Sequence, residues 1–222
     1  MAKTGTYEVT ADIPEPAMEN YLASDLLAVD TEMQGLQLGR DQVCLVQLCD
    51  RKGNVSLVRP VPPNAPANLK KLLTAPNVTK LFHYAVSDVA FLRSSLGIEV
   101  HPYRCTKVMS KLVRTYSDKH SLKTLVQEFI GLDLSKENQS SNWGAPVLGD
   151  SQLEYAANDV LHLISIFEQL TTMIEQRGNL PTGLSAADLN RRSQESLPVM
   201  VDLLLNGYGD RDRGWETSLF SH

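Results

Sequence analysis

Apolar residues in the first half of the chain form short runs that are typical of buried strands. Such runs predict strands at residues 26–32, 43–50, 54–60 and 78–84, and a fifth at 98–103. The first three runs follow one another through short polar links, which favours an antiparallel meander. A helix over residues 87–97, closed by Gly97, follows the fourth strand. This order of elements predicts an α/β fold, a mixed five-stranded sheet flanked by helices.

Beyond about residue 104 the pattern is that of helices and loops. Residues 105–116 place apolar side chains on one helical face and Lys107, Lys111 and Arg114 on the opposite face, which we expect to be exposed. Plain solvation and contact with phosphate explain those charges equally well. Longer helices are predicted from about Gln152 to Gln176 and from Ala186 to about Leu205. We therefore expect one domain over residues 1–222, with additional C-terminal helices.

Composition and charge restrict the class of function. The chain has 222 residues, of which 42% are hydrophobic, enough for a sizeable core. No apolar run approaches the ~20 residues of a membrane helix, and the first residues lack an apolar signal core, so we expect a cytoplasmic protein without membrane contact. The cysteines Cys44, Cys49 and Cys105 form no C-x-x-C pair and should be reduced core thiols. A net charge of -5 disfavours an extended surface for long polyanions.

Two acids end the first predicted strand, in the stretch LLAVDTEMQGL. Alternation along a strand places Asp30 and Glu32 on one face, where their charges repel unless a cation lies between them. A solvated strand end is the more common explanation of such a pair. Asp88 lies in the first turn of the helix after the fourth strand, and Asp159 lies one turn after Tyr155 on a late helix. Each of these residues has an ordinary explanation alone: helix electrostatics for Asp88, a polar position on an amphipathic helix for Asp159, and core packing for Tyr155.

Taken together, these residues resemble the tyrosine-bearing branch of the DEDD superfamily of 3′-5′ exonucleases. The segment LSKENQSSNWGAPVLGDSQLEYAANDVLHL is similar to the third motif region of the ribonuclease D family. Within that family the likeness is greatest to the nanoRNase C group of short bacterial enzymes, which the segments CTKVMSKLVRTYSDKHSLK and GWETSLFSH also resemble. The likeness is weakest over residues 1–20 and over the segment NGYGDRDRG.

The resemblance implies a ribonuclease H-like fold and a phosphodiesterase site that uses two divalent ions, Mg²⁺ or Mn²⁺. Asp30 would bridge both ions, Glu32 and Asp159 would hold the ion that delivers the attacking water, and Asp88 would support the second ion. Tyr155 would orient that water and help to deprotonate it. Hydrolysis at the 3′ end would release nucleoside 5′-monophosphates.

The resemblance also implies contacts to the substrate. Leu36 would wedge between the last two bases, with Gly35 letting the backbone turn to present it, although a core position for Leu36 suits the sequence equally well. His83 could face the site, and a core histidine with satisfied hydrogen bonds is the more ordinary interpretation. A basic cluster could clamp a few phosphates, and its members are Lys107, Lys111, Arg114, Lys119, His120 and Lys123.

We therefore expect a 3′-5′ exoribonuclease that acts on short single-stranded RNA, with dinucleotides as the best substrates. A homo-oligomer such as an octamer is implied, with residues 206–222 at a subunit contact through Trp215 and Phe220. Three alternatives stay open: a broader RNA or DNA exonuclease of the ribonuclease D trimming type, a DNA proofreading exonuclease, and a catalytically silent nucleic-acid-binding module. The presence of all four acids argues against the silent module, and a chain of this length should lack the accessory domains of the other two.

Overall fold

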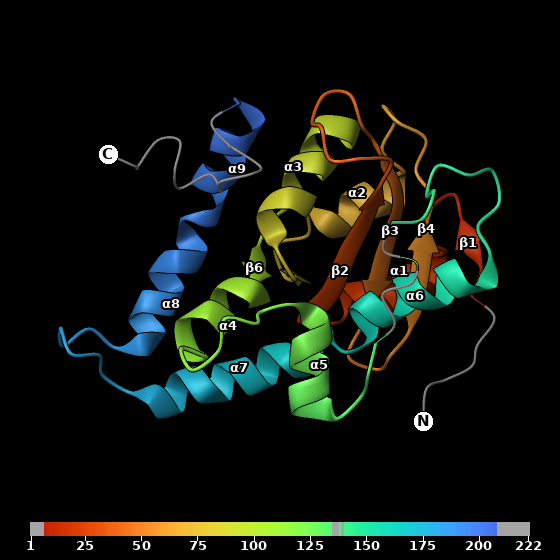
Figure 1. Cartoon of the computed structure of the whole chain (residues 1–222). Coiled ribbons are helices and arrows are strands. Elements are labelled where there is room, and N and C mark those ends of the chain that lie inside the picture. Colours follow the sequence, from red (N-terminus) through yellow and green to blue (C-terminus); the bar gives the residue numbers. More distant parts are fainter. Residues whose placement is uncertain (1–6, 135–137, 139, 208–222) are drawn as a thin grey trace.

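The computed structural model describes residues 7–134, 138 and 140–207, and over them it forms a mixed sheet with helices on both faces (Figure 1). The strands are β1 (Val9–Thr10), β2 (Leu26–Met33), β3 (Val43–Cys49), β4 (Val55–Val58), β5 (Thr79–Phe82) and β6 (Tyr103–Cys105). The helices are α1 (Glu15–Leu22), α2 (Ala67–Leu73), α3 (Ala85–Leu96), α4 (Thr106–Val113), α5 (Leu122–Ile130), α6 (Asp150–Leu161), α7 (Leu163–Arg177), α8 (Ala186–Glu195) and α9 (Leu197–Leu205).

The six strands lie in the order β1-β4-β3-β2-β5-β6. The antiparallel meander of β2, β3 and β4 is confirmed, and β5 and β6 continue the sheet parallel to β2. The predicted count of five strands is wrong because β1, parallel to β4, has only two residues and leaves no periodic pattern in the sequence. The predicted strand at 98–103 is also misplaced. Its strand begins only at Tyr103, directly after Pro102, which has no backbone N–H to donate.

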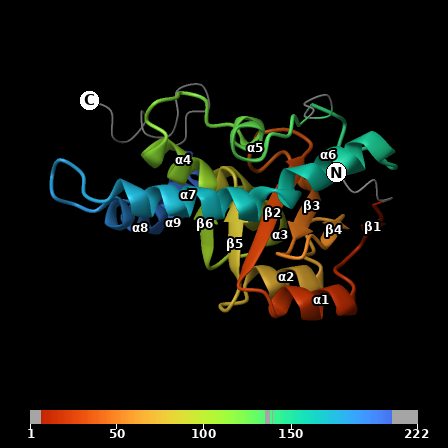
Figure 2. The ribbon, with the colours of Figure 1, turned by 90° about the horizontal axis from the view of Figure 1, so that it is seen from below.

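Helices cover the two faces of the sheet with separate apolar clusters. α1, α2, α3 and α9 pack on one face, against Leu27, Val29 and Leu48 among others. α6 and α7 pack on the other face, against Leu26 and Ala28 of β2 and their neighbours. Figure 2 shows α6 and α7 running along one side of the sheet, with α1 and α2 on the opposite side. The central strand β2 is therefore buried between two helical layers, as its apolar run predicts.

The helix boundaries differ from the prediction in the second half of the chain. The helix predicted from Gln152 to Gln176 is two helices, α6 and α7, separated at His162. Both pack on β2, and α6 extends over β3 and β4 whereas α7 extends over β5. The helix predicted from Ala186 to Leu205 is also two, because Pro198 lies in the first turn of α9 and cannot donate the hydrogen bond that would continue α8. The end of α3 at Gly97 is confirmed by its left-handed backbone, with φ of 62°.

The three cysteines are buried and form no disulfide, as predicted. Over the described ranges, the helices are too short or too polar to traverse a lipid bilayer.

Arg114 does not lie on the exposed face where the sequence pattern places it. Its side chain is 1% exposed and forms an ion pair with Glu128 of α5, and it donates a 2.7 Å hydrogen bond to the carbonyl of Lys119. The helical spacing misleads here because α4 ends at Val113, so Arg114 follows the helix with a non-helical backbone. Arg114 therefore ties the end of α4 to α5 and to the connection between them.

We expect Arg114→Met to lower the free energy of unfolding by about 2 to 3 kcal/mol, because it leaves the partly buried Glu128 carboxylate and the Lys119 carbonyl without their donor. Lys111→Met, on the exposed side of α4, is the matched control and should change stability by less than about 0.5 kcal/mol. Chemical denaturation of both variants measures the difference. Equal stabilities would show that the buried pair is not a structural link.

Candidate active site

Three carboxylates converge at the end of β2. Asp30 and Glu32 project from the same face of the strand, and α6 crosses that face and brings Asp159 to it. Each of the three offers one oxygen, and these oxygens all lie within 4.8 Å of one another. The sequence places Asp159 127 residues after Glu32, so only the packing of α6 on β2 unites them.

Asp88 reaches the same pocket from the opposite side of the sheet. It lies in the first turn of α3, and its carboxylate accepts a 2.6 Å hydrogen bond from the Thr31 hydroxyl. Thr31 stands between Asp30 and Glu32 on the strand, so it points to the face that α3 covers. This hydrogen bond fixes Asp88 at the strand end, and Thr31 is a site residue that the sequence analysis did not identify.

Burial raises the pKa values of all four acids, and repulsion from neighbouring carboxylates adds to the effect at Asp30 and Glu32. Burial raises the pKa of Asp30 well above its ordinary value, and the neighbouring carboxylates raise it further. Burial is also the main cause for the others, and it raises the pKa of Glu32 to about 9, that of Asp159 to about 7 and that of Asp88 to about 6. Among the described residues, no lysine or arginine forms a salt bridge with any of these acids.

Tyr155 stands beside this cluster. It lies one turn before Asp159 on α6 and hydrogen-bonds to its carboxylate. Its ring packs against the buried Trp143, with ring centroids 6.1 Å apart. Burial, followed by the charges of Asp159 and Glu32, raises the pKa of Tyr155 far above its ordinary value. The hydroxyl is therefore a proton donor at neutral pH.

The acids line a pocket of about 380 Å³. Its other walls include Leu36, His83, Tyr84 and Lys107. Leu36 is 63% exposed, so the alternative that it is a core residue is wrong. At Gly35 a Cβ would lie 2.4 Å from Asp41 Oδ2, so a larger residue there would displace the Asp41 carboxylate.

Asp41 explains why the segment before β3 comes so close to Gly35. One of its carboxylate oxygens accepts a 2.8 Å hydrogen bond from the backbone N–H of Gln37. Arg40 forms an ion pair with the same carboxylate, 2.6 Å from Nε to Oδ1. These contacts close the loop between β2 and β3 and hold Leu36 at the rim of the pocket.

His83 lines the pocket, but both of its ring nitrogens are engaged. Nδ1 lies 2.9 Å from the Thr106 hydroxyl and Nε2 lies 2.9 Å from the backbone carbonyl of His120. Burial lowers the pKa of His83 to about 4, so the ring is neutral at physiological pH. The interpretation as a histidine with satisfied hydrogen bonds thus agrees with its contacts, although its position is at the site.

Part of the predicted basic cluster lies away from the pocket. Lys107 and Lys123 are among the pocket residues, whereas Lys111, Arg114 and His120 are not. His120 instead places its Nδ1 2.9 Å from the Ser110 hydroxyl. The pattern of charges could not separate these roles, because a lysine in the wall of a pocket and one in open solvent look alike in a sequence.

Tyr84 is a pocket residue that the sequence analysis missed. It is 45% exposed, and the Lys107 ammonium lies 4.3 Å from the centroid of its ring. Its φ of 104° is the only positive value among the described non-glycine residues. A non-glycine residue in this conformation is strained, and such strain concentrates at functional sites. No pattern in the sequence marks this position.

The donor set fits a divalent cation. The ligand atoms are carboxylate oxygens, which suit Mg²⁺ or Mn²⁺. Burial and neighbouring carboxylates raise the pKa values of Asp30 and Glu32, and a bound cation would favour their charged forms. Asp30, Glu32 and Asp159 are placed to hold such an ion together, and Asp88 is placed to contribute from the other side of the strand end.

Comparisons with known proteins agree with this geometry. A family model described as 3′-5′ exonuclease matches residues 9–175. Ribonuclease D of Xanthomonas oryzae pv. oryzae is 32% identical over 165 residues, which are 74% of this chain and 44% of the relative. The chain thus spans less than half the length of this relative.

Two solved structures of one Brucella melitensis protein, NrnC, resemble the fold over nearly its whole extent. The structure of NrnC bound to pGG has a TM-score of 0.84 and 33% identity, covering 97% of this chain and 99% of that one. The structure of NrnC with bound Mg²⁺ has a TM-score of 0.83 and 33% identity, covering 96% and 97%.

The resemblance to the ribonuclease D family inferred from the motifs is confirmed by these relatives, as is the mixed α/β architecture. The matched region runs through every strand from β1 to β6 and into α7, so it contains all four acids and Tyr155. The chain belongs to the 3′-5′ exonuclease family.

Proposed function

We propose that the protein is a two-metal-ion 3′-5′ exoribonuclease that hydrolyses short oligonucleotides, down to dinucleotides, to nucleoside 5′-monophosphates. The observation that carries this proposal is the convergence of Asp30, Glu32 and Asp159 in a pocket whose rim presents Leu36. The family match supports phosphodiester hydrolysis, and the Mg²⁺ bound by the similar protein NrnC supports a divalent metal.

In this proposal, the acids bind the ions and other pocket residues position the substrate. Asp30, Glu32 and Asp159 hold the ions, and Asp88, fixed by Thr31, completes the ligand set. When bound, the ions lower the pKa of a coordinated water and neutralise charge on the scissile phosphate. The side chains that surround the acids orient the water and contact the phosphate.

Tyr155 and Lys107 provide the hydrogen-bonding and charge contacts beside the acids. The Tyr155 hydroxyl, which stays protonated, orients the attacking water and does not act as an unaided base. Lys107, against the ring of Tyr84, offers a positive charge to a phosphate of the substrate.

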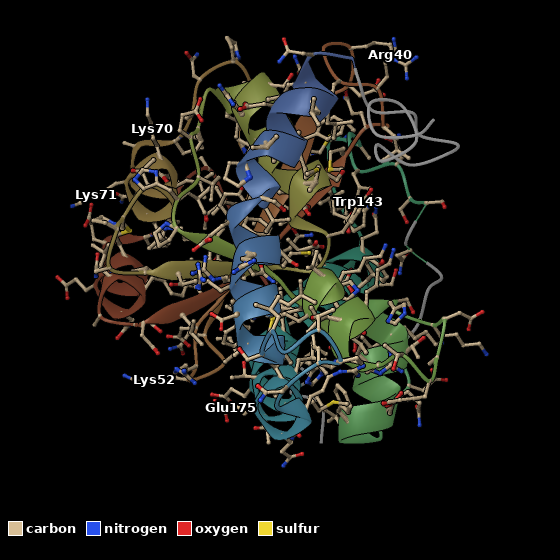
Figure 3. The ribbon with its side chains drawn as sticks, turned by 90° about the vertical axis from the view of Figure 1, so that its left-hand side faces the viewer. Arg40, Lys52, Lys70, Lys71, Trp143 and Glu175 are labelled. Carbon is tan, nitrogen blue, oxygen red and sulfur yellow. The ribbon has the colours of Figure 1, made fainter. Side chains whose placement is uncertain are left out.

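Three features support a preference for short substrates. The pocket volume of about 380 Å³ is at the low end for small-molecule sites. Four basic residues outside it do not gather into one patch: Figure 3 shows Arg40, Lys52 and the pair Lys70 and Lys71 at separate places on the edge of the molecule. The ligand bound in one structure of the similar protein NrnC, pGG, is a two-residue oligonucleotide with a 5′ phosphate.

A broader trimming exonuclease is the second candidate, because the curated relatives matched are ribonuclease D enzymes. The two candidates differ in how the rate depends on substrate length. A silent binding module is disfavoured because Asp30, Glu32 and Asp159 converge and Asp88 lines the same pocket. The proposed homo-oligomer rests on the sequence resemblance alone, and Trp215 and Phe220, which we expect at its subunit contact, lie outside the described residues.

We expect Asp30→Asn and Asp159→Asn to reduce hydrolysis by more than about 100-fold, because each removes a charged metal ligand. Each should also raise the melting temperature in EDTA, since it removes one of several repelling buried charges. Glu154→Gln, an exposed acid on α6, is the matched control and should leave both quantities unchanged. If either variant, free of contaminating nuclease, keeps more than about a tenth of the wild-type rate, the assignment of these ligands is wrong.

Tyr155→Phe should have a smaller effect, about 10- to 100-fold on kcat, because it removes an orienting hydroxyl and no metal ligand. The shape of the pH-rate profile should stay that of the wild type between pH 6 and 9, because the high pKa of Tyr155 keeps it protonated throughout. The measurement is kcat against pH for both proteins with a dinucleotide. Loss of one limb of the profile in the variant would identify Tyr155 as a titrating base.

Substrate length distinguishes the two enzyme candidates. We expect kcat/KM at fixed salt to be highest for dinucleotides and to fall for longer RNA, since a small pocket gains nothing from phosphates that it does not contact. Leu36→Ala should flatten this profile, because the exposed Leu36 is the proposed wedge at the rim. Val61→Ala, which changes an equally exposed apolar residue outside the pocket, is the control. A steady rise with length that Leu36→Ala leaves unchanged would favour the trimming enzyme.

A further inference from the structure

Gln47 lies next to the candidate metal ligands and has no role in the chemistry described so far. It stands in the middle of β3, and the antiparallel register pairs it directly with Asp30 of β2. Residues opposite each other in such a pair project to the same face, with Cβ atoms about 4.5 to 5.5 Å apart. The Gln47 side chain therefore lies beside the Asp30 carboxylate, on the sheet face that α6 covers.

The surroundings of Gln47 are otherwise apolar. Leu45 flanks it along β3, Leu57 is its partner on β4, and Ala156 of α6 belongs to the same packed cluster as both leucines. Gln47 is 0% exposed, and within the described part of the chain neither Nε2 nor Oε1 has a hydrogen-bond partner. A buried amide that lacks partners is destabilising, and a leucine or methionine would fill this space without that cost.

We propose that Gln47 is a positioning residue for Asp30: when Asp30 binds a divalent cation, Gln47 Nε2 donates to its carboxylate a hydrogen bond that the present structure does not make, and so fixes the orientation of the Asp30 oxygens. The proposal rests on the proposed metal-dependent function of the site. Asp30 is the polar side chain that the register places directly opposite Gln47, and a carboxylate that binds a metal is itself commonly held by such a hydrogen bond.

A second buried donor without a partner lies near Gln47. Over the described residues, three buried side-chain nitrogen or oxygen atoms have no hydrogen-bond partner: Gln47 Nε2, Gln47 Oε1 and Trp143 Nε1. Trp143 belongs to the same cluster as Leu45 and Leu57, which flank Gln47. Its N–H can only donate, and Gln47 Oε1 can only accept. A chain of hydrogen bonds from Trp143 through Gln47 to Asp30 would satisfy the polar atoms of all three side chains.

The same substitution at two buried glutamines tests the proposal. Gln194 of α8 is 3% exposed, but its amide is satisfied: Oε1 accepts from the Cys105 backbone N–H at 2.8 Å and Nε2 donates to the Cys105 carbonyl at 3.1 Å. None of the residues that line the acidic pocket comes from α8. Gln194→Met is therefore a matched control for Gln47→Met in the full-length chain.

The primary readouts are binding of Mn²⁺ by isothermal titration calorimetry and the melting temperature in EDTA. We expect Gln47→Met to weaken Mn²⁺ binding by about 10-fold or more and to raise the melting temperature, because it removes a buried amide without partners. Gln194→Met should lower the melting temperature and bind Mn²⁺ like the wild type. Wild-type affinity in a folded Gln47→Met protein would overturn the proposal.

Two further measurements guard against ambiguous results. If Gln47→Met does not fold, Gln47→Asn is the second variant. It keeps the amide group but places it one methylene farther from Asp30, so it should also weaken Mn²⁺ binding. Unchanged Mn²⁺ affinity in Gln47→Asn overturns the proposal. With a dinucleotide at saturating Mn²⁺, Gln47→Met should lower kcat with little change in KM, and an unchanged kcat counts against a positioning role. A wild-type protein that binds Mn²⁺ but hydrolyses nothing would instead refute the proposed function. The Mn²⁺ affinity of the Gln47→Met variant would still test the positioning role of Gln47.

Discussion

The crowding of partly buried carboxylates at the end of β2 is the constraint on which the rest of this structure depends. Asp30, Glu32 and Asp159 have oxygens within 4.8 Å of one another. Burial raises the pKa of each, and repulsion from neighbouring carboxylates raises the pKa values of Asp30 and Glu32 further, so their charged forms are disfavoured here. A fold pays for such an arrangement only when something else benefits, and here that is the capacity to bind a hard divalent cation. The surrounding elements can be understood as the scaffold that forces the acids together.

That scaffold holds the acids from both faces of the sheet. β2 is buried between two helical layers, so its end cannot relax away from α6, which carries Asp159 and Tyr155, or from α3, which carries Asp88. Thr31 links the two layers because it sits between two acids on the strand yet bonds to an acid on the opposite helix. The rigidity comes from packing of apolar residues such as Val29 and Ala28, and the chemistry is carried by the few polar residues at the strand end.

Buried polar side chains of this fold include two contrasting pairs. Arg114 and Gln194 have complete sets of partners, and their contacts are those of structural links between helices and loops. The side-chain polar atoms of Gln47 and Trp143 have no hydrogen-bond partner among the described residues. Both side chains lie under α6, beside groups proposed to act in hydrolysis. Unsatisfied buried groups are rare in folded proteins, so their concentration at this place indicates a functional constraint that packing alone would not impose.

The sequence by itself determined the meander of β2 to β4, the end of α3 at Gly97, and the family, because apolar runs, a left-handed glycine and a motif of fixed order are local properties. Local spacing could not reveal the two-residue strand β1, the breaks at His162 and Ser196, or the burial of Arg114, since each depends on what packs against the segment. The candidate acids could be named from the sequence, but their roles there came from resemblance. Only the tertiary structure decided that α6 brings Asp159 to Asp30 and that Thr31 holds Asp88, because these contacts join residues far apart in the chain. It also decided that Leu36 is exposed and that Tyr84 lines the pocket, because side-chain burial is not encoded in any local pattern.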